Sequence, residues 1–205
     1  MTGAETSGIY EVAARTYSQS HARWLRFAGG EAQCAFEGAV TALMRPGARV
    51  LDVACGIGTV ARRLLDNSDI GIDLTLLDSA QNMLDHCTDI PAVRVNGCMK
   101  ALPFEDNSFD ILTCAWGLET QRNPCPALAE FVRVTRPGGQ ICLVFCADRP
   151  AQSWIASLLR HRVSRSGRGT FLDHLNMKRL AQDAGAVRVQ LLHCSGPAAA
   201  MILHV

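Results

Sequence analysis

Residues 49–146 alternate between short apolar runs and stretches in which apolar residues recur with helical spacing. The apolar runs predict strands at 49–54, 70–77, 93–96, 109–115 and 140–146. The periodic stretches predict helices at 59–65, 80–87 and 126–134. Because the expected strands are apolar on both faces, they fit a mostly parallel sheet that helices cover on each side. The alternation therefore predicts an α/β fold in three layers.

The chain on either side of this region extends the pattern. Helices are expected at 9–19 and 31–44, with a break at Ala28-Gly29-Gly30 between them, so that residues 1–44 form an N-terminal helical cover. The tail predicts a helix at 151–161, a basic loop at 160–168, a helix at 175–185 and strands at 187–193 and 199–205. Gly196-Pro197 is typical of the turn in an antiparallel hairpin. The length, 205 residues, fits one domain, 1–205.

The composition narrows the partners and the compartment. The chain has 20 basic and 19 acidic side chains, and this balance argues against nucleic acid as the main partner. Nine cysteines without a CxxC pair or zinc spacing indicate free thiols in a reducing cytoplasm and no metal site. No apolar stretch is long enough to cross a bilayer, and the first residues lack the apolar run of a signal peptide.

Two segments leave alternatives open. Residues 154–159 are apolar and precede the arginines of the basic loop, so they could make a peripheral contact with a membrane. A helix with one face in the core and one in solvent explains the same pattern, and we favour it. Cys142 and Cys146, four apart on an expected strand, share a face, and we expect them to pack in the core rather than bind a metal.

The strongest local signal is the stretch 50–59, in which an apolar strand runs into Gly56-Ile57-Gly58 and then into a helix. Glycines let the backbone approach a ligand, and the helix N-terminus offers free N–H groups. A Gly-x-Gly turn alone is weak evidence, because many tight turns contain one.

An acidic residue at the end of the second expected strand adds to this signal. Asp78 follows Gly58 by 20 residues and could accept hydrogen bonds from both hydroxyls of a ribose. An acidic cap on the helix that starts at Ser79 is the alternative, and Asp73 is a rival for the ribose. We prefer Asp78 because Ser79 and, later, Met83 follow it.

A nicotinamide or flavin enzyme could use the same strand, turn and helix. Residues 56–61 come close to the alanine-tolerant form of the dinucleotide fingerprint, so the turn does not decide the question. Asp52 at the end of the first strand does, because its charge would repel a pyrophosphate.

Four ordered motifs resemble the class I S-adenosylmethionine-dependent methyltransferases, specifically the small-molecule group with the ubiquinone and menaquinone methyltransferases (methyltransferase type 11). The motifs are residues 50–59, Asp78-Ser79 with Met83-Leu84, LPFEDNSFD at 102–110 and EFVRVTRPGG at 130–139. The resemblance covers residues 45–147 well and the C-terminal part more loosely. It implies a Rossmann-like three-layer sandwich, with a seven-stranded, mostly parallel sheet that ends in an antiparallel hairpin. It also implies methyl transfer to a small molecule, such as a quinone or lipid precursor.

The same resemblance implies a binding site for S-adenosylmethionine. The amino-acid part would lie on Asp52 and the turn of Ala54, Cys55, Gly56, Ile57 and Gly58. Asp78 with Ser79 would bind the ribose, Cys98 and Met99 would flank the adenine, and Ala115 and Trp116 would line the methyl-donor end. This sequence departs from the family at two places. Ala54 replaces the first glycine of the turn, and Cys98, a weak acceptor, stands where the family often has an acid or Asn.

Methyl transfer depends mainly on holding acceptor and methyl group in line, and a base is needed only when the acceptor must lose a proton. Glu119, shortly after Trp116, is a candidate base, with a surface or capping acid as the alternative. Tyr17 and His21 lie four apart on the first helix, which covers the site in resembling enzymes. Tyr17 would line the cofactor pocket and His21 would touch the substrate, unless they are ordinary surface residues.

Three functions remain to be compared. The first is a methyltransferase that acts on a small molecule, and the absence of an Asn/Asp-Pro-Pro-Tyr segment after the fourth strand disfavours an amide or nucleobase amino group as the acceptor. The second is a non-catalytic protein that binds S-adenosylmethionine as a partner or regulator, which Ala54 and Cys98 keep open. The third is a nicotinamide oxidoreductase, which the later motifs disfavour. A homodimer is compatible with the sequence.

Overall fold

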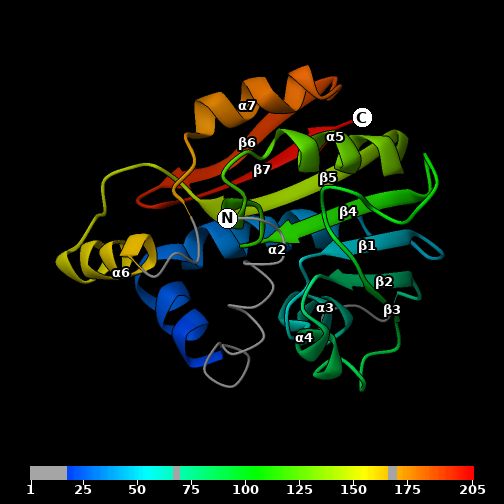
Figure 1. Ribbon diagram of the computed structural model, residues 1–205, viewed down its shortest axis with the longest axis horizontal. Coiled ribbons are helices and arrows are strands. Elements are labelled where there is room, and N and C mark those ends of the chain that lie inside the picture. Colours follow the sequence, from blue (N-terminus) through cyan, green and yellow to red (C-terminus); the bar gives the residue numbers. More distant parts are fainter. Residues whose placement is uncertain (1–17, 67–69, 166–169) are drawn as a thin grey trace.

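The computed structural model describes residues 18–66, 70–165 and 170–205, which build a sheet of seven strands (Figure 1). The strands are β1 (Arg49–Val53), β2 (Asp73–Asp78), β3 (Val93–Asn96), β4 (Phe109–Ala115), β5 (Thr135–Cys146), β6 (Arg188–Ser195) and β7 (Ala198–His204). Their order across the sheet is β3-β2-β1-β4-β5-β7-β6. The first five pair in parallel, whereas β7 runs antiparallel to both β5 and β6. The predicted α/β fold with its C-terminal antiparallel hairpin is confirmed.

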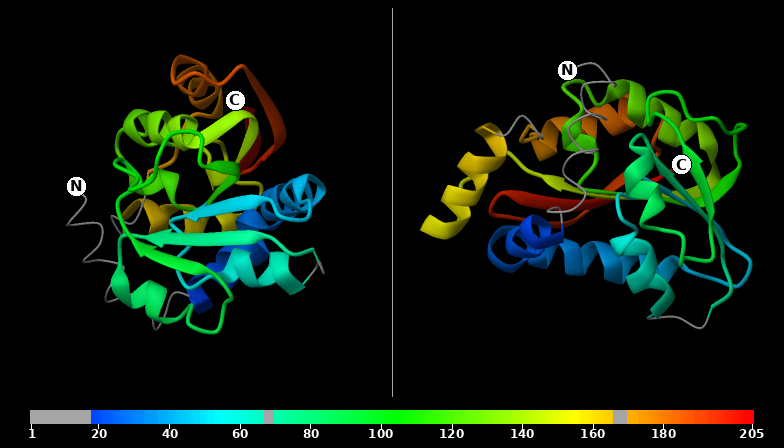
Figure 2. Two further views of the ribbon diagram at one scale, coloured as in Figure 1. Left: turned by 90° about the vertical axis from the view of Figure 1, so that its right-hand side faces the viewer. Right: turned by 60° about the horizontal axis from the view of Figure 1, so that its bottom comes forward.

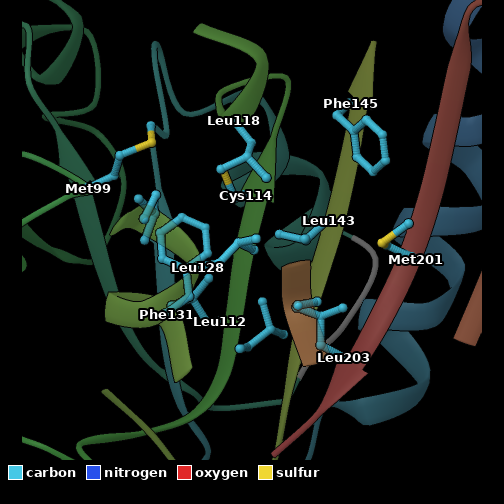
Figure 3. Close-up of a cluster of buried hydrophobic side chains, with 14 of the residues drawn as sticks. Met99, Leu112, Cys114, Leu118, Leu128, Phe131, Leu143, Phe145, Met201 and Leu203 are labelled. Carbon is cyan, nitrogen blue, oxygen red and sulfur yellow. The ribbon is translucent and has the colours of Figure 1, made fainter. Parts of the chain in front are cut away.

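Helices cover both faces of this sheet (Figures 1 and 2). They are η1 (Leu25–Gly29), α2 (Gly30–Leu43), α3 (Thr59–Asp66), α4 (Gln81–Asp85), η2 (Leu118–Thr120), α5 (Cys125–Val134), α6 (Trp154–Arg165) and α7 (His174–Asp183). On one face, α5 and α7 bury Leu128, Phe131 and Met177 in the apolar cluster that Figure 3 shows in part. On the other face, α2 buries Phe36 and Val40. The predicted three layers follow from these two apolar interfaces.

The strand order places a ligand crevice at a defined point. β1 has β2 on one side and β4 on the other, so the direction in which the chain adds strands reverses between β1 and β4. In open parallel sheets, ligands bind outside the carboxyl ends of the strands at such a switch point. The segments that follow β1, β2 and β4 therefore form the candidate site.

The N-terminal helical region differs from the prediction. The expected break at residues 28–30 is absent, because the helix runs from residue 18 to residue 43 and passes through the π-helical segment η1. A Cβ on Gly29 would lie 2.5 Å from Nε1 of Trp24 and 2.8 Å from Cη2 of Trp116. Gly29 therefore lets two tryptophans pack against the helix rather than ending it. The part of the expected first helix before residue 18 lies outside the described residues.

Two expected loops are also regular structure. The predicted turn at residues 137–139 belongs to β5, which begins at Thr135, and it interrupts the register with β4 between Phe109 and Ile111. A Cβ on Gly139 would lie 2.8 Å from the carbonyl oxygen of Asp110, so only glycine permits this approach. The predicted basic loop is helical as far as Arg165, because it continues α6. Arg168 lies outside the described residues.

Cys142 and Cys146 are both buried in the apolar cluster between the sheet and α2, as predicted. Among the described residues, no cluster of His, Cys, Asp and Glu side chains could hold a metal ion. None of the helices in the described part of the chain is both long enough and apolar enough to span a membrane.

Candidate active site

The turn between β1 and α3 has the backbone of a ligand-binding loop. Ala54, Gly56 and Gly58 have φ angles of 56°, 55° and 75°. The carboxylate of Asp78 fixes this loop, since its Oδ2 accepts a hydrogen bond from Gly56 N at 2.8 Å and its Oδ1 accepts one from Ala80 N at 2.9 Å. Asp78 thus organises the loop from the end of β2, which the sequence did not reveal.

Gly58 must be glycine for steric reasons as well. A Cβ there would lie 2.4 Å from Cδ1 of Ile90 and 3.0 Å from Sγ of Cys87. Together with its positive φ angle, this contact explains why the loop enters α3 through a glycine.

The departure at Ala54 has a structural counterpart on the neighbouring strand. A residue with a Cβ in the left-handed region costs about 1–2 kcal/mol, and Ala54 occupies that region. A Cβ on Gly117, which follows β4, would lie 2.5 Å from the Cβ of Ala54. Gly117 therefore makes room for the methyl group of Ala54.

Asp52 is a buried carboxyl group with one unsatisfied oxygen. Its side chain is 2% exposed, and its Oδ1 accepts a hydrogen bond from Thr113 Oγ1 at 2.7 Å. Within the described part of the chain, Oδ2 is buried without a hydrogen-bond partner. Burial raises the pKa of Asp52 to about 7, against the opposing effect of the Thr113 hydrogen bond. A buried carboxylate of this kind is complementary to a cationic group that carries N–H donors.

Asp52 lies at a pocket that several of the predicted residues share. The pocket is lined by His21, Asp52, Ala54, Cys55, Thr59, Val60, Ala115 and Trp116. Thr59 and Val60 were not predicted, and the other six were. The structure therefore brings residues from the N-terminal helix, β1, the turn and β4 to one place.

Trp116 forms the wall of this pocket and is held in a fixed position. Its indole Nε1 donates a hydrogen bond to Gln33 Oε1 at 2.6 Å, and Gln33 Nε2 donates one to Glu37 Oε1 at 2.6 Å. The ring stacks edge-on against Trp24, with 5.9 Å between centroids. Trp116 itself has a φ angle of 56°, a conformation that only such packing maintains.

His21 lies against the same wall, with its ring 6.2 Å from that of Trp116. Burial and the nearby Arg63 lower the pKa of His21 to about 4, and Glu37 opposes this shift. His21 is therefore neutral near pH 7 and brings no positive charge to the pocket. Tyr17, its predicted companion, lies outside the described residues.

Glu119 lies on η2, beyond the end of β4, and is 4% exposed. It is not a surface acid, which was the alternative in the sequence. Its Oε1 accepts a hydrogen bond from Cys146 N at 3.4 Å, whereas Oε2 is buried and has no hydrogen-bond partner among the described residues. Burial raises the pKa of Glu119 to about 7. Its backbone carbonyl accepts a hydrogen bond from Thr170 N at 2.9 Å, so Thr170 lies against Glu119.

The remaining predicted residues lie around the ends of β2 and β3. Ile57 packs against Ala80 and Met83, and Ser79 is exposed. Cys98 is half-buried and forms an isolated bridge with Ala101. Met99 is 8% exposed and belongs to the same apolar cluster as Cys114 and Leu118. None of these residues lines the pocket of Asp52, and their predicted contacts with the adenosine part of the cofactor stay a prediction.

Two residues that shape the site were missed in the sequence. Thr113 is buried and binds Asp52, and the signal available was a hydroxyl within the apolar run 109–115. Gln33 is 2% exposed and holds Trp116, and a polar residue on the apolar side of α2 was the only hint. Both act through contacts with residues far away in the sequence.

Comparison with known proteins shows what the central region of the chain resembles. Residues 51–143 match the family described as a methyltransferase domain. The match covers somewhat less than half of the chain. Its likeness to the class I methyltransferases that act in ubiquinone and menaquinone biosynthesis, predicted from the motifs, is confirmed.

Two curated relatives illustrate this likeness. The demethylmenaquinone methyltransferase of Renibacterium salmoninarum is 44% identical over 100 residues, which are 47% of this chain and 40% of the relative. The ubiquinone/menaquinone biosynthesis C-methyltransferase UbiE of a Ruegeria species is 36% identical over 118 residues, 52% of this chain and 45% of the relative. The chain thus spans less than half the length of these relatives.

Solved structures extend the likeness to the whole fold. An S-adenosylmethionine-dependent methyltransferase of Thermotoga maritima superposes with a TM-score of 0.71 at 20% identity, over 96% of this chain and 98% of the other. A chain from a Haloferax volcanii complex that contains the Trm112 methyltransferase activator gives a TM-score of 0.72 at 17% identity, over 95% and 96%. At these identities the likeness establishes the fold alone.

Proposed function

We propose that this chain transfers the methyl group of S-adenosylmethionine to a small-molecule acceptor, a quinone or lipid precursor. One observation carries the proposal: the buried, unpartnered Oδ2 of Asp52 lies at a pocket beside a loop with three left-handed residues. Relatives named as quinone methyltransferases support the acceptor class.

The residues present fit S-adenosylmethionine, which supplies a methyl group on a positively charged sulfur. Asp52 would accept hydrogen bonds from the amino group of the ligand, which removes the cost of leaving Oδ2 buried without a partner. The backbone of the turn, fixed by Asp78, would hold the carboxylate end near the N-terminus of α3. Trp116 would face the cationic end with its ring.

We further propose that Glu119 is the base for the acceptor. It combines deep burial, a carboxyl oxygen without a partner and a pKa near neutrality, a combination that favours proton transfer at physiological pH. Positioning of the acceptor against the methyl group would supply the rest of the rate. All nine cysteines are free thiols, which supports a reducing compartment such as the cytoplasm.

The test is calorimetric titration of the purified chain with S-adenosylmethionine and its demethylated product. We expect micromolar dissociation constants for the wild type, and a loss of at least roughly tenfold in Asp78→Asn, because this substitution removes a charge that holds the loop. Asp73→Asn is the matched control, since Asp73 is an exposed acid at the start of the same strand.

The acceptor is then sought by incubating the chain with S-adenosylmethionine and reduced demethylated quinones, followed by mass spectrometry for the added methyl group. Binding without turnover on any acceptor would favour the non-catalytic alternative. A folded wild type that binds neither ligand would contradict the proposal as a whole.

A further inference from the structure

Helix α6 exposes apolar side chains that a soluble helix usually buries. Trp154 is 77% exposed and Leu158 is 51% exposed, while Ala156 is 2% exposed and packs inward. Trp154, Leu158, His161 and Arg165 follow one another at helical spacings of four, three and four residues, so they share the outward face. The favoured interpretation of the sequence, one face in the core and one in solvent, is confirmed for Ala156 and Leu159, which pack inward, but Trp154 and Leu158 lie on the solvent side.

The charged residues in the stretch of chain that contains α6 have one sign. No acidic residue lies between Asp148 and Asp173, and the interval contains five arginines, at positions 149, 160, 162, 165 and 168. Arg160 is engaged by Asp148 at 2.5 Å. Arg162 and Arg165, in contrast, are exposed in the last turns of α6.

Helix α7 shows what an ordinary exposed face looks like in the same protein. It exposes Leu175, which is 67% exposed, but its charges are mixed. Asp173 and Asp183 border the helix, and Lys178 and Arg179 lie between them. Of these two helices, α6 alone combines exposed apolar side chains with arginines and no acidic residue.

The place of α6 relates it to the candidate site. The helix projects from the end of the molecule toward which the arrows of β2 and β4 point (Figure 1), and it stands out from the body in the right-hand view of Figure 2. A series of contacts between aromatic rings connects an arginine of α6 to the wall of the pocket. The guanidinium of Arg160 lies 4.8 Å from the ring of Phe171, which lies 6.3 Å from that of Trp24. Trp24 in turn contacts Trp116.

We propose that α6 binds the surface of an anionic lipid bilayer. Trp154 and Leu158 enter the interface between headgroups and acyl chains, where the amphipathic tryptophan ring is favoured, and Arg162 and Arg165 contact lipid phosphates. An anionic bilayer accounts for both the exposed apolar side chains and the arginines, since its acyl chains are apolar and its headgroups are negatively charged. This inference goes beyond the proposed methyl transfer and does not depend on it.

The test is co-sedimentation with vesicles of phosphatidylcholine alone and of phosphatidylcholine mixed with phosphatidylglycerol. We expect binding to the mixed vesicles, weaker binding when salt is added, and little binding to phosphatidylcholine alone. Trp24 and Trp116 are only 7% and 9% exposed, so Trp154 should dominate quenching of the protein fluorescence by brominated lipids. The variant Trp154→Phe should lose most of this quenching while it still sediments.

Variants of the arginines and of the apolar residues test the proposed contact with the bilayer separately. Arg162→Gln with Arg165→Gln should weaken binding on the order of 25-fold, about 5-fold for each arginine. Trp154→Ser with Leu158→Ser should weaken it by roughly tenfold or more. The matched controls on α7, Leu175→Ser and Arg179→Gln, should bind as the wild type does. Circular dichroism confirms that each variant is folded.

Three results would overturn the proposal. They are no binding of the wild type to anionic vesicles, equal losses in the α6 and α7 variants, or a wild-type dimer in gel filtration that the α6 variants dissociate. The last result would show that a second copy of the chain covers this face.

Discussion

Asp52 and Glu119 are two buried carboxyl groups near the carboxyl ends of neighbouring strands, and their surroundings differ. Both have one oxygen without a hydrogen-bond partner in the described part of the chain, and burial raises the pKa of each to about 7. Asp52 lies at a pocket beside the glycine-rich turn, and a threonine hydroxyl fixes its other oxygen. Glu119 lies beside Thr170, accepts a long hydrogen bond from Cys146 N and has the Cys146 thiol next to its carboxyl group.

The different surroundings of the two carboxyl groups favour cation binding at one and proton transfer at the other. A carboxylate held in place by Thr113 at a pocket suits a ligand cation that stays bound, and such a cation lowers the pKa of the carboxyl group. A carboxyl group that no fixed cation reaches keeps its pKa near neutrality, which suits proton transfer. The same raised pKa therefore predicts binding at Asp52 and catalysis at Glu119.

The largest expected effect is that of Glu119→Gln on turnover. General bases contribute on the order of 100-fold or more, so kcat should fall by about that factor while the Kd for S-adenosylmethionine stays unchanged. In the wild type, kcat should rise as pH increases toward about 7 and level off above it, because the base acts only when unprotonated. The variant should lose this dependence, which a pH profile of single-turnover rates measures.

Glu105→Gln provides the control for this prediction, because Glu105 is an exposed acid in the motif 102–110. Equal pH profiles in the wild type and in Glu119→Gln would remove Glu119 from the reaction. A loss of cofactor binding in Glu119→Gln would instead show that Glu119, like Asp52, contributes to binding the cofactor.

The next effect concerns the affinity of Asp52 for the cofactor. Asp52→Asn keeps an acceptor for Thr113 but removes the charge, so the Kd should increase by roughly 30-fold, about 2 kcal/mol. In the wild type a cation competes with the proton on Asp52, so affinity should rise with pH between about 5 and 7. Proton release on binding, measured by calorimetry in buffers of different ionisation enthalpy, should disappear in the variant.

A wild type that binds S-adenosylmethionine equally well at pH 5 and pH 7, without releasing a proton, would show that Asp52 is not the partner of the amino group. Glu119→Gln serves as the control here, because its proton release should equal that of the wild type. Glu119→Gln is thus the test variant in the kinetic measurement and the control variant in the binding measurement.

What the sequence revealed about these two groups differs for a physical reason. The strands, the turn at residues 54–58 and the place of Asp52 follow from a local pattern of apolar runs and glycines. The environment of Glu119 depends on Thr170, 51 residues further along the chain, and that of Trp116 depends on Gln33, 83 residues earlier. No local pattern contains such contacts. The same holds for the apparent break at residues 28–30, where Gly29 serves the packing of Trp24 and not a turn.

The smallest expected effect concerns the contact between Ala54, which follows β1, and Gly117, which follows β4. Gly117 has φ −108° and ψ −37°, which alanine tolerates, so Gly117→Ala tests only the lack of space. It should lower the free energy of unfolding by about 1–3 kcal/mol, because the new Cβ would lie 2.5 Å from that of Ala54. Urea unfolding of the apoprotein measures this change.

Ala54→Gly should relieve the contact and the left-handed strain together, so Gly117→Ala should cost less in that background, with a coupling of about 1 kcal/mol. Part of the cost should remain, because Cys114 Sγ lies 3.1 Å from the same Cβ position. Gly38→Ala is the control, since a Cβ there meets nothing within 4 Å and should stabilise α2. If the changes in the free energy of unfolding for Ala54→Gly and Gly117→Ala were additive, the two segments would not be coupled. The positions of Asp52 and Glu119 would then be set independently of each other.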